Sequence, residues 1–193
     1  NILTCRRVLQ MANWTSFMQN SPIDIPTRTV NVAVIAVEGS LQSAIAGLAD
    51  LFWITNQAMR APPTGVAERL PAPALINFNT TIASADGHSP QAAQGRRIPV
   101  DCSLDEIGPC DIALVAGMAL GPDRLPPVSG SIEKAAKWLG TRHKQGTVIG
   151  GACAGTFIVG EAGLLDGRRC TTTWWLHHAF KRRFPKARPV WGT

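Results

Sequence analysis

The sequence predicts an α/β fold with a mostly parallel sheet. Two observations support this prediction: continuous β-branched runs at 30–37 (VNVAVIAV) and 111–117 (DIALVAG), and helical periodicity at 43–60 and 130–146. Strands of parallel sheets are buried on both faces, so they appear in a sequence as continuous apolar runs. Strands that alternate with helices of this length form βαβ units, in which the strands run parallel. The 193 residues are enough for one well-buried domain.

The first half of the chain divides into an arm and a strand–helix–strand unit. Residues 1–29 are predicted to form a separate N-terminal arm or extra helix, to which no function is assigned. After the strand at 30–37, the helix at 43–60 is expected to be largely buried, because many apolar side chains widen its stripe. A strand at 73–84 and a short strand at 98–101 follow. The apolar stripe of the helix consists of Ile45, Leu48, Leu51, Phe52, Ile54 and Met59.

The second half continues this alternation. Ser131 is the candidate N-cap of the next helix, because a hydroxyl at a helix start accepts a backbone hydrogen bond, and Gly146 is the candidate C-cap. The last helix ends before Pro185, which lacks a backbone N–H. In order, the predicted elements are a strand at 111–117, a helix at 130–146, a strand at 147–150, and helices at 154–165 and 174–184.

Composition excludes several classes of protein. With 45% hydrophobic and 17% charged residues the chain is typical of a folded globular protein. It contains no bilayer-spanning apolar run and does not open with a secretory leader, so we expect no membrane contact and a cytoplasmic location. The five cysteines form no Cys-x-x-Cys pair, and no metal, cofactor or disulfide framework is predicted. Seven basic residues and one acid between 166 and 193 are interpreted as a solvated helix end.

The most informative stretch is GGACAG at 150–155, between a predicted strand and a helix. The functional crevice of an open parallel sheet lies outside the carboxyl ends of its strands, where this stretch falls. The small residues around Cys153 fit an elbow that holds a nucleophile in strained backbone angles, where bulky neighbours would clash. The backbone N–H of Ala154, with Gly117 or Met118 across the crevice, would then face an oxyanion. The alternative is a buried structural cysteine on a tight turn.

Longer stretches resemble one known superfamily. The resemblance rests on VNVAVIAVEGSLQSAIAGLADLFWITNQA, DIALVAGM and GACAGTFIVGEAGLLDGRRCTTTWWLHHAFKRRFP. These stretches resemble the ThiJ/PfpI superfamily of class I glutamine-amidotransferase-like domains, and within it the N-terminal sensing domain of AraC-type transcription regulators. The resemblance spans about residues 30–192 and implies a flavodoxin-like three-layer α/β/α sandwich at 30–193. Relative to the family, the last strand and helix and the helix-turn-helix domain are not represented.

The resemblance also implies three catalytic parts: an elbow cysteine, a nearby histidine and a carboxylate after the first strand. Cys153 matches the cysteine, but Thr173 stands where the regulator branch has its histidine, and Gln42 stands where a carboxylate is expected. A threonine hydroxyl can hydrogen-bond a ligand but is no base near neutral pH. Glu38 is interpreted as ending the first strand in water. The predicted ligand-binding residues are Ser40, Gln42, Gly117, Met118, Cys153, Ala154, Thr173 and Trp174, with Cys153 as the candidate nucleophile or redox thiol.

The leading hypothesis is a catalytically inactive sensing domain of an AraC-type regulator, with its ligand pocket at the former active site. Of Trp174 and Trp175, one is expected in the core and the other in the pocket wall. An aromatic wall would suit the amino acids or quaternary amines to which some family members respond. The family further implies a homodimer, and DNA binding only through the helix-turn-helix domain. Three alternatives stay open: a cysteine-dependent hydrolase, amidase or glyoxalase-like enzyme; a Cys153 redox sensor; and a dimerisation module.

Overall fold

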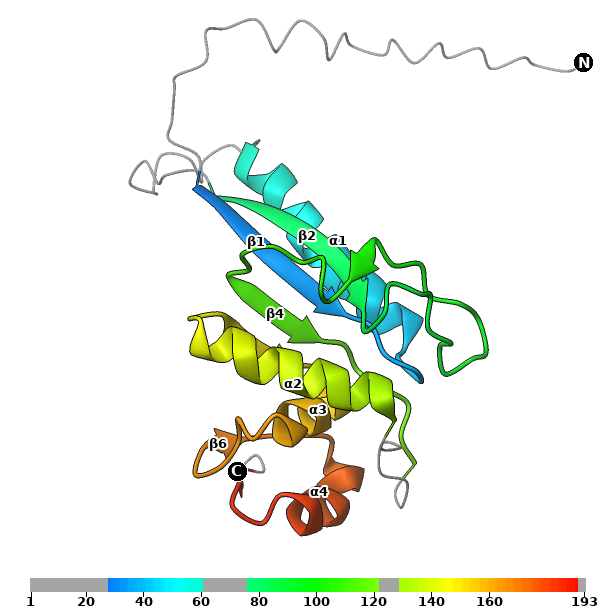
Figure 1. Ribbon diagram of the computed structural model, residues 1–193, viewed down its shortest axis with the longest axis vertical. Coiled ribbons are helices and arrows are strands. Elements are labelled where there is room, and N and C mark those ends of the chain that lie inside the picture. Colours follow the sequence, from blue (N-terminus) through cyan, green and yellow to red (C-terminus); the bar gives the residue numbers. More distant parts are fainter. Residues whose placement is uncertain (1–27, 61–75, 122–128, 191–193) are drawn as a thin grey trace, which may run out of the picture.

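A five-stranded parallel sheet forms the centre of the molecule (Figure 1). The computed structural model describes residues 28–60, 76–121 and 129–190. Of the predicted arm at 1–29, only the last two residues are described, and they begin β1. Neighbouring strands of this sheet all run parallel, in the order β3-β2-β1-β4-β5, which confirms the predicted fold class. The strands are β1 (Arg28–Ile35), β2 (Ile76–Ser84), β3 (Cys102–Ser103), β4 (Ile112–Val115) and β5 (Val148–Gly151).

Helices lie on both faces of the sheet and make the three predicted layers. Helix α1 lies on one face, and α2 and α3 lie on the other (Figure 1). None of the helices in the described part of the chain is long and apolar enough to cross a bilayer. The helices are α1 (Gln42–Arg60), α2 (Gly130–Lys144), α3 (Thr156–Glu161) and α4 (His177–Arg183); two 3₁₀ turns, η2 (Cys153–Gly155) and η3 (Trp174–Leu176), precede α3 and α4, and β6 (Arg169–Cys170) pairs with β7 (Arg188–Pro189).

Strand β1 is buried on both of its faces, as its continuous apolar run predicts. Val30, Val32 and Val34 belong to the cluster on the α1 side. Ala33 and Ile35 belong to the cluster on the α2 and α3 side. Because successive side chains of a strand point to opposite faces, a run that is apolar at every position belongs in the middle of a covered sheet.

Two predicted details of the elements are wrong. The stretch at 98–101 is not a strand; the two residues that follow it form β3 and pair with the end of β2. The N-cap of α2 is Ser129, not Ser131. Ser129 has an extended backbone, and its Oγ accepts a hydrogen bond from the backbone N–H of Ile132 at 3.4 Å. A cap must stand outside the helix to reach back to its first turn, and Ser131 already lies within it.

Helix α1 is not largely buried, contrary to the prediction from its apolar stripe. Ile45 is buried, but Leu51, Trp53 and Ile54 are 55%, 62% and 57% exposed. Within the described residues α1 contacts mainly β2 and β1. A single helix lying on a sheet buries only the side that faces the sheet, so the outer part of a wide apolar stripe stays exposed.

One polar side chain attaches α1 to the edge of β2. The Nδ2 of Asn56 donates to the carbonyl of Phe78, and the N–H of Phe78 donates to Asn56 Oδ1, both at 2.8 Å. Strand β3 pairs only with Ala83 and Ser84, so in the described sheet no strand reaches β2 at Phe78 on this edge. The amide of Asn56 therefore satisfies both backbone groups of Phe78, and the rings of Phe78 and Phe52 pack with centroids 5.0 Å apart.

We expect Asn56→Ala to lower the free energy of unfolding by about 1–3 kcal/mol, because it removes both partners of partly buried backbone groups. Gln57→Ala is the matched control on the exposed side of the same helix and should stay within about 0.5 kcal/mol of the wild type. Urea unfolding followed by circular dichroism measures both. Equal effects of the two substitutions would show that Asn56 does not hold α1 in place.

Candidate functional site

The turn between β5 and α3 has the geometry of a nucleophile elbow. Cys153 has a φ of 51°, and it is the only non-glycine residue with positive φ in the described part of the chain. This left-handed conformation is strained for a residue that carries a Cβ atom, and such strain costs on the order of 1–3 kcal/mol. The predicted elbow is therefore present, and Cys153 stands at its apex with an exposed side chain. The alternative of a buried structural cysteine does not fit this exposure.

Two glycines allow the turn to pack this tightly. A Cβ atom on Gly151 would lie 2.8 Å from Gly155 C and from Thr156 N. A Cβ atom on Gly155 would lie 2.5 Å from the carbonyl oxygen of Val115, at the end of β4. Both distances are well inside van der Waals contact, and the obstructing atoms belong to backbone that cannot turn aside. The elbow therefore requires glycine two residues before and two residues after Cys153.

Two threonine hydroxyls hold the elbow from the other side. Thr156 Oγ1 donates to the carbonyl of Cys153 at 2.9 Å, and Thr172 Oγ1 donates to the same carbonyl at 3.3 Å. Thr156 lies on α3, whereas Thr172 lies between β6 and η3 and reaches the elbow only through the fold. Neither threonine is among the site residues predicted from the sequence. A threonine three residues after the elbow cysteine is a local signal for Thr156, but no local signal marks Thr172.

The loops after β1 and β4 meet beside the elbow. Ser40 and Met118 form an antiparallel bridge, and the N–H of Leu41 donates to the carbonyl of Gly117 at 2.8 Å. Gly117 lies against Cys153, since a Cβ atom built on it would be 3.4 Å from Cys153 Cβ. The structure thus brings Ser40, Gly117, Met118 and Cys153 together, as predicted from the carboxyl ends of parallel strands. The hydroxyl of Ser40 is buried and accepts a hydrogen bond from its own loop, from Val37 N at 3.1 Å.

Two side chains near the position of the family's expected carboxylate, Glu38 and Gln42, point to another loop. Glu38 Oε2 accepts a hydrogen bond from the N–H of Gln91 at 2.9 Å, so Glu38 does not simply end the strand in water. Gln42 Nε2 lies 3.5 Å from the carbonyl oxygen of Arg97, at the limit of a hydrogen bond. Both contacts attach the loop after β1 to the loop after β2. Neither Glu38 nor Gln42 bonds to Cys153.

The thiol of Cys153 stands without a base. Its Sγ has no hydrogen-bond or ion-pair partner among residues 28–60, 76–121 and 129–190. In the same ranges no three His, Cys, Asp or Glu side chains are grouped as a metal ion would require. Burial raises the pKa of three other thiols, so at neutral pH they form less thiolate than an exposed cysteine. These three are Cys102, Cys110 and Cys170.

Beside the elbow lies an unpartnered hydroxyl next to two exposed tryptophans. Thr173 Oγ1 is buried and has no hydrogen-bond partner. Trp174 is 78% exposed and Trp175 is 40% exposed, so the expectation that one of them lies in the core is wrong. The two rings stack edge to face at 5.6 Å, and Trp175 Nε1 donates to the carbonyl of Leu120 at 3.2 Å. That hydrogen bond ties the start of α4 to the loop after β4.

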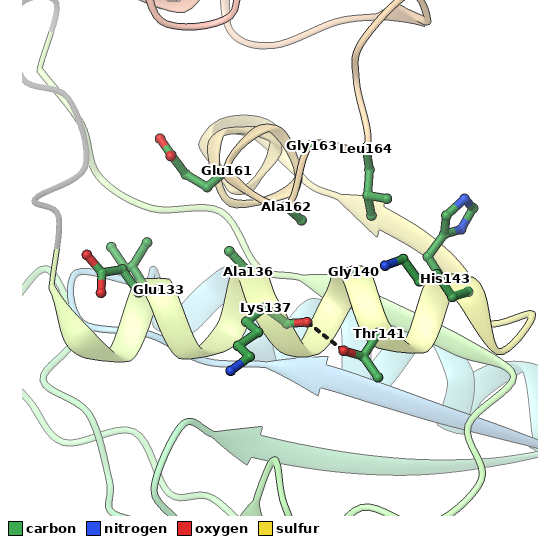
Figure 2. Close-up of a pocket in the computed structure, with 12 residues that line it drawn as sticks. Glu133, Ala136, Lys137, Gly140, Thr141, His143, Glu161, Ala162, Gly163 and Leu164 are labelled. Atoms are coloured by element: carbon green, nitrogen blue, oxygen red, sulfur yellow. Dashed lines mark hydrogen bonds between the residues drawn. The ribbon is translucent and has the colours of Figure 1, made fainter.

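A separate groove of about 620 Å³ lies between α2 and α3 (Figure 2). Small residues of α2 and of the turn after α3 form its floor, and Glu133 and Glu161 stand at one end. None of the predicted ligand-binding residues lines it, because the groove follows the end of α3 and Cys153 precedes its start. This groove is therefore distinct from the elbow. Its floor residues are Ala136, Gly140, Ala162 and Gly163.

Comparison with known proteins identifies the relatives of this chain. The DJ-1/PfpI family matches residues 63–184. The HTH-type transcriptional regulator CdhR of Pseudomonas aeruginosa is 31% identical to this chain over 105 residues, or 54% of the chain. The HTH-type transcriptional regulator GbdR of the same species is 28% identical over 139 residues, or 72% of the chain. The aligned parts span only 30% of CdhR and 36% of GbdR. The crystal structure of an AraC family transcriptional regulator from Pseudomonas putida has the same fold, with a TM-score of 0.61 and 20% identity over 84% of this chain and 77% of that one.

We expect Gly155→Ala to lower the free energy of unfolding by about 1–3 kcal/mol, because its Cβ atom meets the carbonyl of Val115. Its φ of −58° suits alanine, so the effect would come from the clash alone. Gly130→Ala at the start of α2 is the control, since a Cβ atom there has nothing within 4 Å. Chemical unfolding compares the two variants. A Gly155→Ala protein as stable as Gly130→Ala would contradict the close approach of the elbow to β4.

Proposed function

The chain belongs to the DJ-1/PfpI family, and from this premise we propose that it is the small-molecule-sensing domain of an AraC-type transcription regulator. The similarity to two HTH-type regulators supports this assignment. About two thirds of each regulator lies outside the similar part, which is room for a separate domain that reads DNA. In this proposal the chain acts in the cytoplasm and reaches DNA only through a helix-turn-helix domain.

The observation that carries the proposal is an intact elbow whose thiol has no base. Cys153 keeps the strained, exposed geometry of a nucleophile, but Thr173 occupies the position where the family places a histidine. Activation of a thiol by a neighbour needs a base within hydrogen-bond reach, and a threonine hydroxyl does not ionise near neutral pH. We infer that the site is catalytically inactive and that its shape serves a ligand.

The side chains around the elbow favour a small cationic or zwitterionic effector. Trp174 offers an exposed indole face, which attracts a quaternary or primary ammonium group. Thr173 Oγ1 lacks a partner and could hydrogen-bond a polar group of the effector. Trp175 is held by its hydrogen bond to Leu120, so the aromatic pair needs little further ordering on binding. An amino acid or a quaternary amine is the class that combines these groups. The proposed contacts are Ser40, Gln42, Gly117, Met118, Cys153, Ala154, Thr173 and Trp174.

A thermal-shift screen with amino acids and quaternary amines tests this function. An effector at 100 times its Kd should add about 2.7 kcal/mol of stability. Trp174→Ala should then weaken binding roughly two- to fivefold, as expected for loss of an exposed cation–π contact. Trp53→Ala is the matched control, because Trp53 is also an exposed tryptophan but lies on α1, on the opposite face of the sheet from α3.

An activity assay on the same purified protein distinguishes a sensor from an enzyme. If the site is inactive, the purified chain should neither hydrolyse model esters and amides nor consume methylglyoxal. Turnover that disappears in Cys153→Ala would overturn the sensor and favour a cysteine-dependent enzyme. If Trp174→Ala and the wild type bind the effector with the same affinity, the effector does not bind beside Trp174 at the elbow.

We also propose that the domain forms a homodimer through the outer face of α1. Gly47, Leu51, Ile54 and Ala58 are exposed at spacings of four, three and four residues, which is the pattern of a helix that packs on another helix. None of these four residues is charged, and the two charged residues of α1, Asp50 and Arg60, are not among them. The Arg60 guanidinium is instead bonded to Asn77 Oδ1 on β2, at 3.2 Å. An apolar helix face of this kind suits the same face of a second copy of the chain, which we take as the partner.

Light scattering coupled to size exclusion measures the oligomeric state. The wild type should elute as a dimer, and Ile54→Glu should shift it to a monomer, because the carboxylate would be buried without a partner. Val190→Glu is the control, since Val190 is an exposed apolar residue at the other end of the molecule. A monomeric wild type, or a dimer that survives Ile54→Glu, would exclude the α1 interface.

A further inference from the structure

Charge is unevenly divided between the two parts of the chain. Residues 129–190 contain eleven Lys and Arg but three Asp and Glu, whereas residues 28–121 contain five Lys and Arg but eight Asp and Glu. Part of this surplus lies at one end of the molecule. Helix α1 lies near one end of the folded part and α4 at the other, with β6 on the same side as α4 (Figure 1). Seven of the eleven cations follow α3 in the chain, in or next to β6, α4 and β7, so much of the surplus positive charge is gathered at this end.

The pairing of β6 with β7 brings three arginines together at this end. Arg169 and Arg188 are direct partners in the parallel pair, and the N–H of Arg188 donates to the carbonyl of Arg168 at 2.9 Å. Like charges placed side by side on adjacent strands repel each other, so this register is unfavourable unless an anion lies between them. We call the exposed cations of β6, β7 and α4 the basic end. They are Arg168, Arg169, Lys181, Arg182 and Arg188.

The carboxylates near the basic end are already engaged. Glu161 accepts hydrogen bonds from Arg183 on both oxygens, at 2.7 and 3.0 Å, and Asp166 lies 3.8 Å from Lys186. The five side chains of the basic end, in contrast, form no hydrogen bond or ion pair within the described residues. A hollow of about 420 Å³ beside β6 is lined by Arg168, Arg169 and His143 and has no carboxylate in its lining. The described part of the chain therefore supplies no counter-charge bonded to these cations.

The composition of the basic end favours phosphate as the partner group. Four of its five cations are arginines, whose planar fork binds two phosphate oxygens at once. Adjacent strands stand about 4.8 Å apart, so Arg169 and Arg188 can reach neighbouring phosphates of one strand of DNA. Helix α4 has seven residues and no length to enter a groove and read bases. The surface fits a backbone contact that does not depend on sequence.

We propose that the basic end contacts the phosphodiester backbone of duplex DNA, next to the site that a helix-turn-helix domain would read. This inference rests on the proposed function, since it assumes a regulator held on DNA. The proposed DNA contact differs from the simpler interpretation of a solvated helix end. The pairing of β6 with β7, and not only the order of the residues in the chain, clusters these cations. The contact adds affinity for DNA but no choice of sequence.

Fluorescence anisotropy of the purified chain with a labelled 20-base-pair duplex of arbitrary sequence tests the contact between 25 and 150 mM KCl. We expect binding that weakens linearly in a plot of log K against log salt. Arg169→Gln/Arg188→Gln should reduce the steepness of that line by about 1.8, the value for two lost phosphate contacts. Arg28→Gln/Arg96→Gln removes the same charge from the other part of the chain and should leave the slope unchanged. If the double variant does not fold, the single variant Arg168→Gln gives a second measurement, and it should reduce the steepness of the line by about 0.9.

Three results would overturn the contact: no binding at 25 mM KCl, equal slopes for the two double variants, or competition by polyglutamate as strong as by unlabelled duplex at equal charge. The last result would assign the basic end to an acidic polypeptide. The thermal-shift screen separates this inference from the proposed function. A chain that binds an effector but not DNA overturns the contact alone, and a chain that binds DNA but no effector overturns the sensor alone.

Discussion

The site depends on one steric constraint, the close approach of the elbow to the end of β4. Gly155 lies so near the carbonyl of Val115 that any side chain would collide with backbone. This approach places the start of α3 over the carboxyl end of the sheet and leaves the chain only a tight turn after β5. Cys153 takes the positive φ that such a turn imposes, and its thiol is thereby presented to solvent. Backbone packing, with two threonine hydroxyls bound to the carbonyl of Cys153, sets the position of the thiol.

Because backbone contacts define the elbow, its shape and its chemistry can change independently. The turn is held by glycines, by a backbone hydrogen bond from Leu41 to Gly117 and by hydroxyls that bind the carbonyl of Cys153. None of these groups takes part in proton transfer. A threonine at position 173 is therefore compatible with the same turn, which carries an exposed thiol beside an unpartnered hydroxyl and an exposed indole. In the proposed function these groups bind an effector.

Three surfaces of the molecule lie on different elements and differ in chemistry. The outer face of α1 is apolar and nearly uncharged, the surroundings of the elbow are aromatic and polar, and the end formed by β6, β7 and α4 is cationic. This difference is why we propose a different kind of partner for each surface: another apolar helix, a small molecule and a polyanion. The elbow and α1 lie on the same five-stranded sheet, which holds them at fixed positions relative to each other.

Much of the fold and the centre of the site could be predicted because their causes are local. The apolar run of β1 predicts a buried strand and the small residues around Cys153 predict an elbow, so the sequence by itself determined the parallel α/β sheet and indicated the position of the thiol. Only the tertiary structure decided that Leu51 and Ile54 face outward, that Thr172 binds the elbow, and that Arg169 stands beside Arg188. The physical reason is that exposure, hydrogen bonding and charge contact depend on residues distant in the chain, whose placement no local pattern encodes.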